Sequence, residues 1–498
     1  MANSNNLSTN PLILALDAGT SSVRALLFDS TGRTLEGMVT RRDYEIITRT
    51  DGSAETDIDI LVGRLWECVD ELLSKAGSLA SQIVGVAECT IVSNMVGVDE
   101  NNRAITPLMT YADTRSAPDA AWLRANYDEA YFHQRVGTLF HPSYWASRFL
   151  WMKREQPEML RQVKRWITLG EYQFLQLFDQ PGVSNSVASW TGLLNRYNLS
   201  WDEEILSLLP IGVENLSPIT DVSEPLRGLR KPFATRWSSL RDVPWFPAVG
   251  DGVGANLGSG CATPNQIAVT MGTTSAVRVV LNETIPVIPP GLWCYRVDRR
   301  RGLLGGAMTE GGNIYAWLND TLKVDRDRVD QEVASILPDS HGLTFLPLLA
   351  GERAPGWMGN ARGAIAGLSL ATTPYELIRA GLEGVGYRVA LIYRLLRPAL
   401  TGQVGVIASG GALQHSPVLM QILADAMEIP VSVSNAPEAS ARGAALLALE
   451  SLGLIPDVSQ APLFLGDVYQ PDPQRSMIYA RAIERQQKLY RQVVLGKD

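Results

Sequence analysis

Residues 16–24 read LDAGTSSVR, and residues 270–278 repeat the pattern as TMGTTSAVR. Each copy lies between two apolar runs, LILAL and ALLF for the first and IAVT and VVL for the second. These runs are rich in strand-forming residues, and the glycine between them marks a turn because glycine adopts positive φ without a steric cost. The sequence therefore predicts two β-hairpins whose tips are small and hydroxylated.

Tips made of Gly, Thr and Ser can bind phosphate, since backbone N–H groups come close to an anion and the hydroxyls add donors. A single tip of this kind is also interpreted as an ordinary polar turn. Two matching tips, one opening each half of the chain, indicate an internal repeat whose two units face one another across a cleft.

The composition excludes several classes of partner. The chain has 498 residues, enough for two or more domains, and its 46% hydrophobic and 19% charged residues are typical of a soluble globular protein. A net charge of −8 and a pI near 5.3 argue against nucleic acid and anionic membranes. An anionic small-molecule substrate stays open, because local arginines can outweigh a modest global charge.

Cysteine usage and the terminal sequence indicate the compartment. The four cysteines have neither zinc-site nor disulfide spacing, and the four histidines are too scattered for a metal centre. The opening MANSNNLSTN lacks a signal sequence, and no apolar run approaches the ~20 residues of a membrane helix. We therefore expect a reduced, cytoplasmic protein with no membrane partner.

The pattern along the first half predicts an α/β layered domain. Apolar residues recur at helical spacing from 58 to 73, and a strand, SQIVGVAEC, follows. Residues 119–180 are mainly helical in pattern, up to a turn at WITLG. The proline-interrupted stretch 230–252 is typical of a connection between domains, so we predict domains at 1–250 and 251–498.

The second half repeats the hairpin and then alternates helices and strands. A helix at EGGNIYAWLND, a loop at LAGERAPGWMGNARG and a long helix near TPYELIRAGLEGVGYRVALIYRLL come first. The strand QVGVIAS, the loop GGALQHS, the helix PVLMQILADAM, the strand PVSVS and the helix EASARGAALLALES follow. The glycines of GGALQHS could let a flat ring or a phosphate lie against the backbone, although one glycine-rich turn is a weak signal.

Two aspartates stand at positions where chemistry is expected. Asp17 ends an apolar strand and points into the first turn, where Mg²⁺ would cancel its repulsion of a bound phosphate; alternatively it caps the turn. Asp251 follows the last strand before a glycine-rich helix start. Ligands of α/β sheets bind beyond the carboxyl ends of strands, so Asp251 is expected as a general base or, alternatively, as a helix cap.

Seven motifs together resemble the FGGY family of carbohydrate kinases over almost the whole chain and in the family's order. They are LDAGTSSVRALLFD, GVDENNRAITPLMTYADTR, GDGVGANLGSG, IAVTMGTTSAVR, LLAGERAPGW, RGAIAGLSL and SGGALQHSPVLMQILADAM with EASARGAALLA. Within that family the segments TYADTRS, VGTLFHPSYW, GEYQFLQLFDQ, NLSWDEEIL and WCYRVD look most like the bacterial gluconate kinases.

The resemblance implies an α/β fold of two RNase H-like domains, as in the actin and sugar-kinase superfamily, with ATP and sugar meeting in the cleft. It implies that Asp17 acts through Mg²⁺ and that Asp251 is the catalytic base that takes the proton from the sugar hydroxyl. The nucleotide contacts that it implies are Gly19, Thr20 and Ser21 at the transferred phosphate, Gly272 and Thr273 at the ATP phosphates, and Gly312, Gly411, Ala412 and His415 beside the nucleotide.

The acceptor site departs from the family pattern. Many sugar kinases of the family have polar sugar-binding residues where this chain has CTI at 89–91. Hydrogen bonds to the acceptor are then expected partly from Ser93 or Asn94. A gluconate carboxylate needs a cationic partner, for which Arg115 and Arg148 are candidates, although either could equally form a structural ion pair.

The leading hypothesis is ATP-dependent phosphorylation of D-gluconate to 6-phosphogluconate. A kinase for a ketopentose such as xylulose or ribulose is the alternative within the family. An actin-like nucleotide switch and a silent sugar sensor are alternatives from other classes, and Asp251 and the intact phosphate tips argue against them. The expected partners are ATP, Mg²⁺ and a small sugar or sugar acid, and a homodimer is left open.

Overall fold

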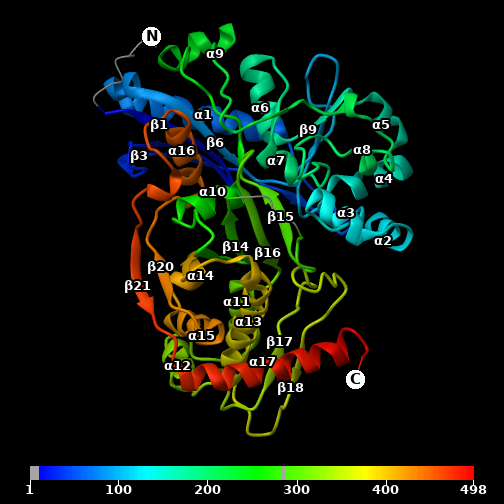
Figure 1. Cartoon of the computed structure of the whole chain (residues 1–498), viewed down its shortest axis with the longest axis vertical. Helices are drawn as coiled ribbons and strands as arrows, with labels where there is room; N and C mark the ends of the chain where they lie inside the picture. The colour runs from blue at the N-terminus through cyan, green and yellow to red at the C-terminus, as the bar shows by residue number, and fades with distance from the viewer. Residues whose placement is uncertain (1–9, 283–286, 498) are drawn as a thin grey trace.

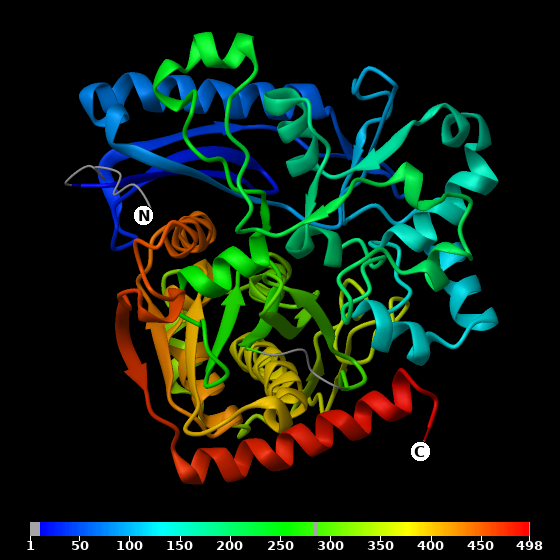
Figure 2. The ribbon, with the colours of Figure 1, turned by 45° about the horizontal axis from the view of Figure 1, so that its top comes forward.

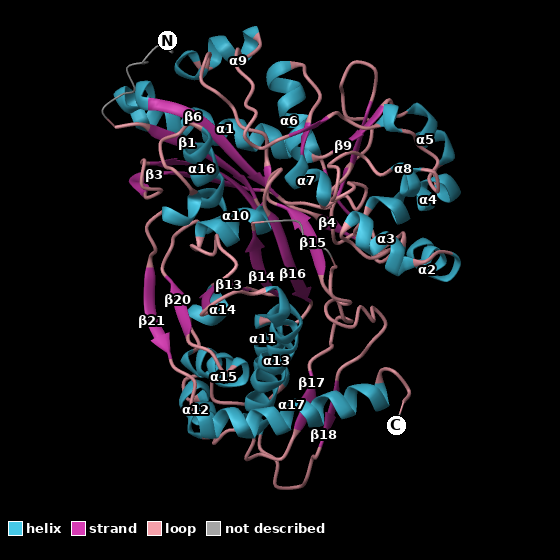
Figure 3. Cartoon of the chain, in the orientation of Figure 1, coloured by secondary structure: helices cyan, strands magenta, loops and turns pink. Residues whose placement is uncertain are grey.

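Two β-sheets with helices on both faces form the centre of the molecule (Figures 1 and 3). The computed structural model describes residues 10–282 and 287–497. The first sheet lies in the N-terminal half and the second in the C-terminal half, one above the other in Figure 2. None of the described helices combines the length and the apolar character needed to cross a membrane.

The first sheet has the strand order β12-β6-β1-β2-β3. Its strands are β1 (Leu12–Ala18), β2 (Ser22–Phe28), β3 (Thr34–Asp43), β6 (Ile83–Thr90) and β12 (Val249–Gly250). β1, β2 and β3 pair antiparallel, whereas β6 runs parallel to β1 and β12 parallel to β6. The register places Asp17 opposite Arg24, so the first predicted hairpin is confirmed. The strand predicted at SQIVGVAEC is confirmed as β6.

The second sheet repeats this plan and extends it. Its order is β15-β16-β14-β13-β19-β20-β21, with β13 (Gln266–Met271), β14 (Ser275–Leu281), β15 (Trp293–Arg296), β16 (Gly302–Met308), β19 (Gly405–Ser409), β20 (Val431–Ser434) and β21 (Leu465–Tyr469). In the hairpin β13–β14, β14 pairs antiparallel with β16 on one side and β13 pairs parallel with β19 on the other, and β19 in turn pairs parallel with β20. The predicted internal repeat is therefore present in the topology.

Helices from both halves of the chain cover the first sheet. α1 (Ile58–Ala76) starts at Asp57, whose carboxylate accepts hydrogen bonds from the N–H groups of Asp59 and Ile60, and its apolar face packs on one side. α16 (Ala439–Ser451), from the C-terminal half, packs on the other side. α10 (Asp251–Gly258) lies between α16 and the second sheet, so the layers run α1, first sheet, α16 with α10, second sheet.

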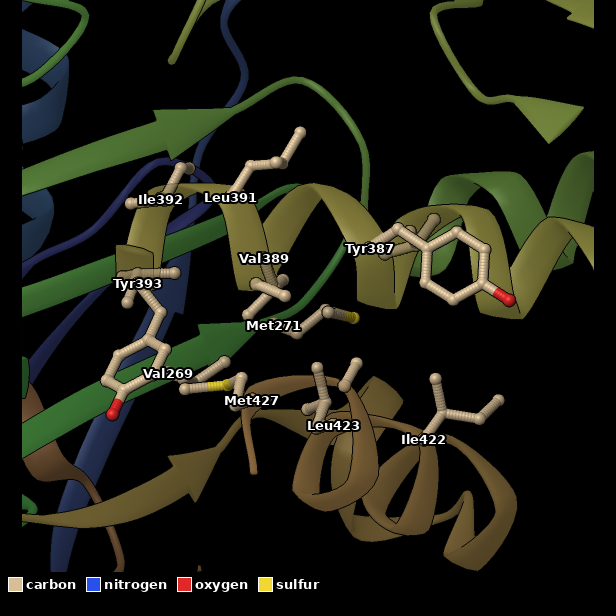
Figure 4. Close-up of a cluster of buried hydrophobic side chains, with 14 of the residues drawn as sticks. Val269, Met271, Tyr387, Val389, Leu391, Ile392, Tyr393, Ile422, Leu423 and Met427 are labelled. Carbon is tan, nitrogen blue, oxygen red and sulfur yellow. The ribbon is translucent and has the colours of Figure 1, made fainter. Parts of the chain in front are cut away.

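The outer face of the second sheet is covered by α13 (Pro374–Leu396) and α15 (Pro417–Met427), as Figure 4 shows. Val269 and Met271 of β13 point into this layer toward Leu423 and Met427 of α15. α17 (Pro473–Val493) packs against α15 from outside. The second hairpin is thereby held on a fully packed support.

The remaining elements form a helical region beside the first sheet and the edges of the second. They are β4 (Ile47–Thr48), β5 (Ala54–Thr56), β7 (Val96–Val98), β8 (Leu108–Met109), α2 (Ala117–Asn126), α3 (Glu129–Val136), α4 (Trp145–Glu155), α5 (Pro157–Gln162), β9 (Arg165–Ile167), α6 (Leu169–Phe178), β10 (Val183–Ser184), α7 (Asn185–Ser189), α8 (Glu203–Leu206), β11 (Ile219–Thr220), α9 (Lys231–Arg236), α11 (Gly312–Thr321), α12 (Val329–Ser335), β17 (Thr344–Leu346), β18 (Ala364–Ala366) and α14 (Gly411–Gln414).

Two local predictions were wrong. The expected turn at WITLG is the end of β9 and the start of α6, where the N–H of Thr168 donates to the Glu171 carboxylate at 2.7 Å and fixes the helix start. The loop GGALQHS contains the short helix α14. The stretch 230–252, predicted to connect two domains, is buried in part, because Trp237 and Trp245 lie under α1 and its end pairs into the first sheet.

Candidate active site

The tip of the first hairpin is a tight turn held by its own backbone. The N–H of Gly19 donates to the carbonyl of Ser22 at 3.0 Å, and the Tyr44 hydroxyl donates to the carbonyl of Gly19 at 2.6 Å. Thr20 and Ser21 are exposed at the tip. Their hydroxyls and the surrounding backbone are therefore free to meet a ligand from solvent.

Asp17 lies buried below this tip, 5% exposed. Its carboxylate pairs with Arg24 at 3.3 Å and accepts a hydrogen bond from the Cys89 thiol at 3.2 Å, while Arg24 also pairs with Glu438 at 2.6 Å. Burial raises the pKa of Asp17 to about 6, with Asp251 and Glu438 adding to the rise against the lowering effect of Arg24 and Cys89. The hydrogen bonds described for the Asp17 carboxylate come from the side chains of Arg24 and Cys89 and not from a backbone N–H of the turn. They do not support the alternative in which Asp17 caps the turn.

Asp251 is the first residue of α10, directly after β12. Gly250 occupies the N-cap position, and the Asp251 carboxylate is half-buried and accepts from the N–H of Gly252 at 2.7 Å. Burial raises its pKa, and the positive charge of Arg278 opposes that rise. The residue predicted as the general base is thus a half-buried carboxylate at a strand end with a raised pKa.

The second hairpin tip contacts the start of α11. The N–H groups of Gly312 and Asn313 donate to the carbonyls of Gly272 and Thr273 at 2.8 and 3.2 Å, and Gly272 and Thr273 are exposed. A Cβ on Gly312 would lie 2.8 Å from the Gly272 carbonyl oxygen and 3.0 Å from the Cβ of Ala412, so only glycine allows this approach. The second hairpin tip, the start of α11 and α14 therefore lie in close contact.

A cavity of about 290 Å³ opens where these elements meet. It brings together four residues predicted beside the nucleotide, namely Gly312, Gly411, Ala412 and His415, with walls that also include Gly311, Tyr315, Asp330, Leu382, Val385, Ser416 and Leu419. Its walls are mainly apolar, and a Cβ on Gly411 would meet nothing within 4 Å, so this stretch of backbone is open. This cavity lies where the sequence predicts the nucleotide, next to the second hairpin tip at which the ATP phosphates are predicted.

The candidate acceptor residues Ser93 and Asn94 lie in the loop after β6. The Ser93 hydroxyl donates to the carbonyl of Trp190 at 3.0 Å. Asn94 is fully buried, with its amide donating to the carbonyl of Ile91 at 2.6 Å and accepting from the N–H of Leu169 at 2.9 Å. The Asn94 side chain is therefore committed to holding the loop, and its position does not favour a contact with sugar.

Arg115 and Arg148 are also committed within the chain. Arg115 pairs with Glu55 and, at 2.6 Å, with Asp113. Arg148 is 1% exposed and donates to three backbone carbonyls, those of Pro142, Ser93 and Thr110, at 3.1, 2.9 and 2.5 Å. Burial lowers the pKa of Arg148 to about 10. The structural ion pair named as the alternative fits Arg115, whereas Arg148 is held by backbone carbonyls.

Sequence reasoning missed a group of cationic and aromatic residues between the two sheets. Arg278 on β14 and Arg353 in the loop before β18 each have a buried Nε without a hydrogen-bond partner. The Trp190 and Tyr295 rings stack nearby with centroids 3.6 Å apart. The repeat itself carries a signal for Arg278, because it occupies the position of Arg24 in the second copy of the pattern.

The residues at the first tip fit a magnesium ion. Carboxylate oxygens are the protein ligands that Mg²⁺ prefers, and Asp17 is a buried carboxylate whose charge Arg24 only partly compensates, as its raised pKa indicates.

Another group of possible metal ligands, Asp339, His341 and Glu383, has charged partners within the chain. Arg485 pairs with Asp339 and Arg379 pairs with Glu383, so the chain already neutralises that cluster.

The two halves of the chain match the two domains of one family of known proteins. Residues 12–258 match the model of the FGGY family of carbohydrate kinases, N-terminal domain, and residues 267–452 match that of the C-terminal domain. The chain is 28% identical over 473 residues to the gluconokinase of Bacillus subtilis (strain 168), covering 93% of this chain and 91% of that protein. It is 31% identical over 468 residues to the glycerol kinase of Leptothrix cholodnii, covering 89% and 91%.

Solved structures share the fold over nearly the full length. The gluconate kinase from Lactobacillus acidophilus superposes with a TM-score of 0.91 at 24% identity, over 97% of this chain and 98% of that one. The ligand-bound xylulose kinase from Lactobacillus acidophilus gives 0.90 at 25% identity, over 96% and 98%. The expected fold of two matching domains is confirmed.

Proposed function

Because the chain belongs to the FGGY family of carbohydrate kinases, we propose that it transfers the γ-phosphoryl group of ATP to the terminal hydroxyl of D-gluconate, giving 6-phosphogluconate. Family membership makes the chain an ATP-dependent carbohydrate kinase. The observation that carries the choice of gluconate is the similarity to the gluconokinases of Bacillus subtilis and Bacillus licheniformis, each 28% identical over 93% of the chain.

The chemical step follows from Asp251 and the two hairpin tips. The terminal hydroxyl oxygen of the sugar acid attacks the γ-phosphorus, the new O–P bond forms, and the bond from the γ-phosphorus to the β,γ-bridging oxygen breaks to release ADP. Asp251 accepts the hydroxyl proton. Positioning and charge neutralisation carry most of such a transfer, so the backbone N–H groups and hydroxyls of both tips hold the phosphates in line.

Asp17 is the residue that would hold Mg²⁺ at the first tip. The ion, when bound, neutralises phosphate charge and so favours attack by the sugar hydroxyl. The negative charge of Asp251 adds to the effect of burial in raising the pKa of Asp17. Exclusion of water from the active site prevents a water molecule from replacing the sugar as the phosphoryl acceptor.

A coupled ADP-release assay over a panel of acceptors tests this function. The panel contains D-gluconate, further aldonates, D-xylulose, D-ribulose, glycerol and D-glucitol, each with ATP and Mg²⁺. We expect the highest kcat/KM with D-gluconate and a product that carries phosphate on O6, identified by ³¹P and ¹³C NMR. Faster turnover of xylulose, ribulose or glycerol than of gluconate would contradict the choice of gluconate and leave the kinase assignment standing.

A further inference from the structure

Two arginines near the centre of the molecule have no acidic partner. Among the described residues, no ion pair within 4.0 Å involves Arg278 or Arg353, and the Nε of each is buried without a hydrogen bond. The Nη1 of Arg278 reaches only the Thr270 hydroxyl, at 3.4 Å. A buried guanidinium without a counter-ion is costly, so these two groups indicate an anionic partner that is not part of the chain.

The Arg278 guanidinium lies near the predicted catalytic carboxylate. A Cβ placed on Gly252, next to Asp251, would be 3.5 Å from the Nε of Arg278. Burial lowers the pKa of Arg278, the charge of Asp251 raises it, and the charge of Arg353 lowers it further. The Asp251 carboxylate and Arg278 are therefore close without being paired, and Arg353 lies within electrostatic reach of Arg278.

The charge of Arg353 acts on a second set of residues. It affects the pKa values of His141, Tyr144 and Tyr295, in each case after the larger effect of burial. Burial, with the charge of Arg353 adding to it, lowers the pKa of His141 to about 3. His141 is thus neutral and can donate or accept a hydrogen bond beside the cationic groups.

Aromatic rings from both halves of the chain gather beside these arginines. Trp190 stacks on Tyr295, the Tyr144 and Tyr295 hydroxyls are 2.5 Å apart, and the His141 and Trp357 rings have centroids 5.4 Å apart. Apolar surroundings lower the local dielectric constant and strengthen the attraction between a guanidinium and an anion. A neutral ligand would leave the guanidinium groups unpaired.

We infer that Arg278 and Arg353 bind the carboxylate of a linear sugar acid and select aldonates over neutral sugars of equal length. The inference rests on the proposed function and adds the residues that set its acceptor class. An extended six-carbon acid places its carboxyl carbon about 7 Å from its terminal oxygen, from bond lengths near 1.5 Å. One end can then meet the guanidinium groups while the hydroxyl at the other end meets Asp251. Arg115 already pairs with acidic residues of the chain and Arg148 already donates to backbone carbonyls.

The test compares D-gluconate with D-glucitol, a neutral polyol of the same length, in the parent protein and in Arg278→Met and Arg353→Met. Each variant removes a guanidinium that makes charge-assisted hydrogen bonds, so we expect KM for gluconate to rise about 10- to 100-fold. The ratio of kcat/KM for gluconate to kcat/KM for glucitol should fall about 10-fold or more in each Met variant, because glucitol has no carboxylate to lose a charged hydrogen bond. The ratio is the readout because loss of the Arg278 charge also raises the pKa of Asp251, which acts on both acceptors. Arg278→Lys keeps the charge and should recover part of the loss.

The matched control is Arg161→Met, which removes an exposed arginine of α5 that pairs only with Glu158. It should keep the parental ratio of gluconate to glucitol. Thermal melts establish that each variant is folded. If a Met variant is not, Arg278→Lys and Arg353→Lys are compared by calorimetry with gluconate and glucitol, and a weaker affinity for gluconate alone supports the inference.

The outcomes separate the inference from the proposed function. If the parent phosphorylates gluconate and the Met variants lose activity on gluconate and glucitol equally, the arginines position the reaction generally and the inference is wrong. If the parent prefers another aldonate, carboxylate selection stands and gluconate is the wrong substrate. Activity of the parent on neutral sugars alone overturns both.

Discussion

At the scale of single residues, Asp251 is the group whose removal should affect chemistry most selectively. Asn keeps the shape of the side chain and one oxygen acceptor but removes the base, so kcat of Asp251→Asn should fall about 10²–10⁴-fold. ATP affinity should change little, because the described nucleotide cavity lies at α11 and α14. Initial rates and ATP titration calorimetry measure the two effects. A variant that keeps more than about a tenth of parental kcat contradicts the role of base.

Asp17 should make the protein less stable at neutral pH in the absence of metal. Its folded-state pKa of about 6 exceeds the unfolded value of 3.8, so the stability it contributes is present below about pH 4 and is lost as the pH rises through about 6. Asp17→Asn stays neutral, and we expect it to be about 1–3 kcal/mol more stable than the parent at pH 8 and equal to it near pH 4.

Urea unfolding of Asp17→Asn and the parent from pH 4 to pH 8, with EDTA present, measures this difference. Activity with Mg²⁺ serves as the second readout and should be largely lost in Asp17→Asn. Equal stability of the two proteins at pH 8 would show that Arg24 and Cys89 fully compensate the buried charge.

At the scale of elements, the crossing of α10 and α16 depends on glycine. A Cβ on Gly443 would lie 2.0 Å from the carbonyl oxygen of Gly254, and a Cβ on Gly258 would lie 1.8 Å from that of Ala439. Backbone atoms cannot move aside as a flexible side chain can, so Gly443→Ala should destabilise the protein by about 1–3 kcal/mol or more. Gly63→Ala in α1 is the matched control.

A Cβ on Gly63 would meet nothing within 4 Å, so alanine there should instead stabilise the protein by about 0.5–1 kcal/mol through higher helix propensity. Chemical denaturation of both variants gives the two signs. If Gly443→Ala proves as stable as Gly63→Ala, the two helices are not in the close contact that the described backbone positions show.

Helices and strands that depend on neighbouring residues could be predicted from the sequence. The distant parts of the chain against which they pack could not. The two hairpins and α1 depend on apolar spacing and on residues such as Gly19 that act within a few positions of the turn. α16 has an apolar, small-residue pattern, but nothing in that pattern indicates that its partner is the sheet formed about 350 residues earlier, because helix packing depends on topology. The prolines of the stretch 230–252 gave no sign that Trp237 and Trp245 within it are buried.

At the scale of the whole molecule, the same distinction applies to the candidate site. The sequence pattern, with the family resemblance, placed Asp17, Asp251 and the two tips at one cleft, and the four residues beside the nucleotide do line one cavity. The arginines were not predictable in this way. The partners of Arg148 are backbone carbonyls of three separate loops, and the isolation of Arg278 shows only when every nearby carboxylate has been placed.

The layer order makes one further prediction about the intact chain. α16 supplies Ala445, Leu446 and Leu449 to a core that also holds Ile13 and Ala87 of the first sheet, all of them 0–1% exposed. A fragment of residues 1–258 lacks α16 and would expose this face of β1 and β6 to water. A contiguous apolar face of this kind is not tolerated in a stable monomer. We therefore expect the fragment to bind a hydrophobic dye and to melt without cooperativity.

The measurement is calorimetry and dye fluorescence of fragment 1–258 beside the full chain, with the fragment 259–498 then added in equimolar amount. Because α16 belongs to the second fragment, mixing should restore a cooperative melt and reduce dye binding, as docking of the helix covers the exposed strands again. A fragment 1–258 that melts cooperatively on its own would show that the first sheet is stable without α16. The two halves would then be independent domains joined at a cleft, and not units completed by each other.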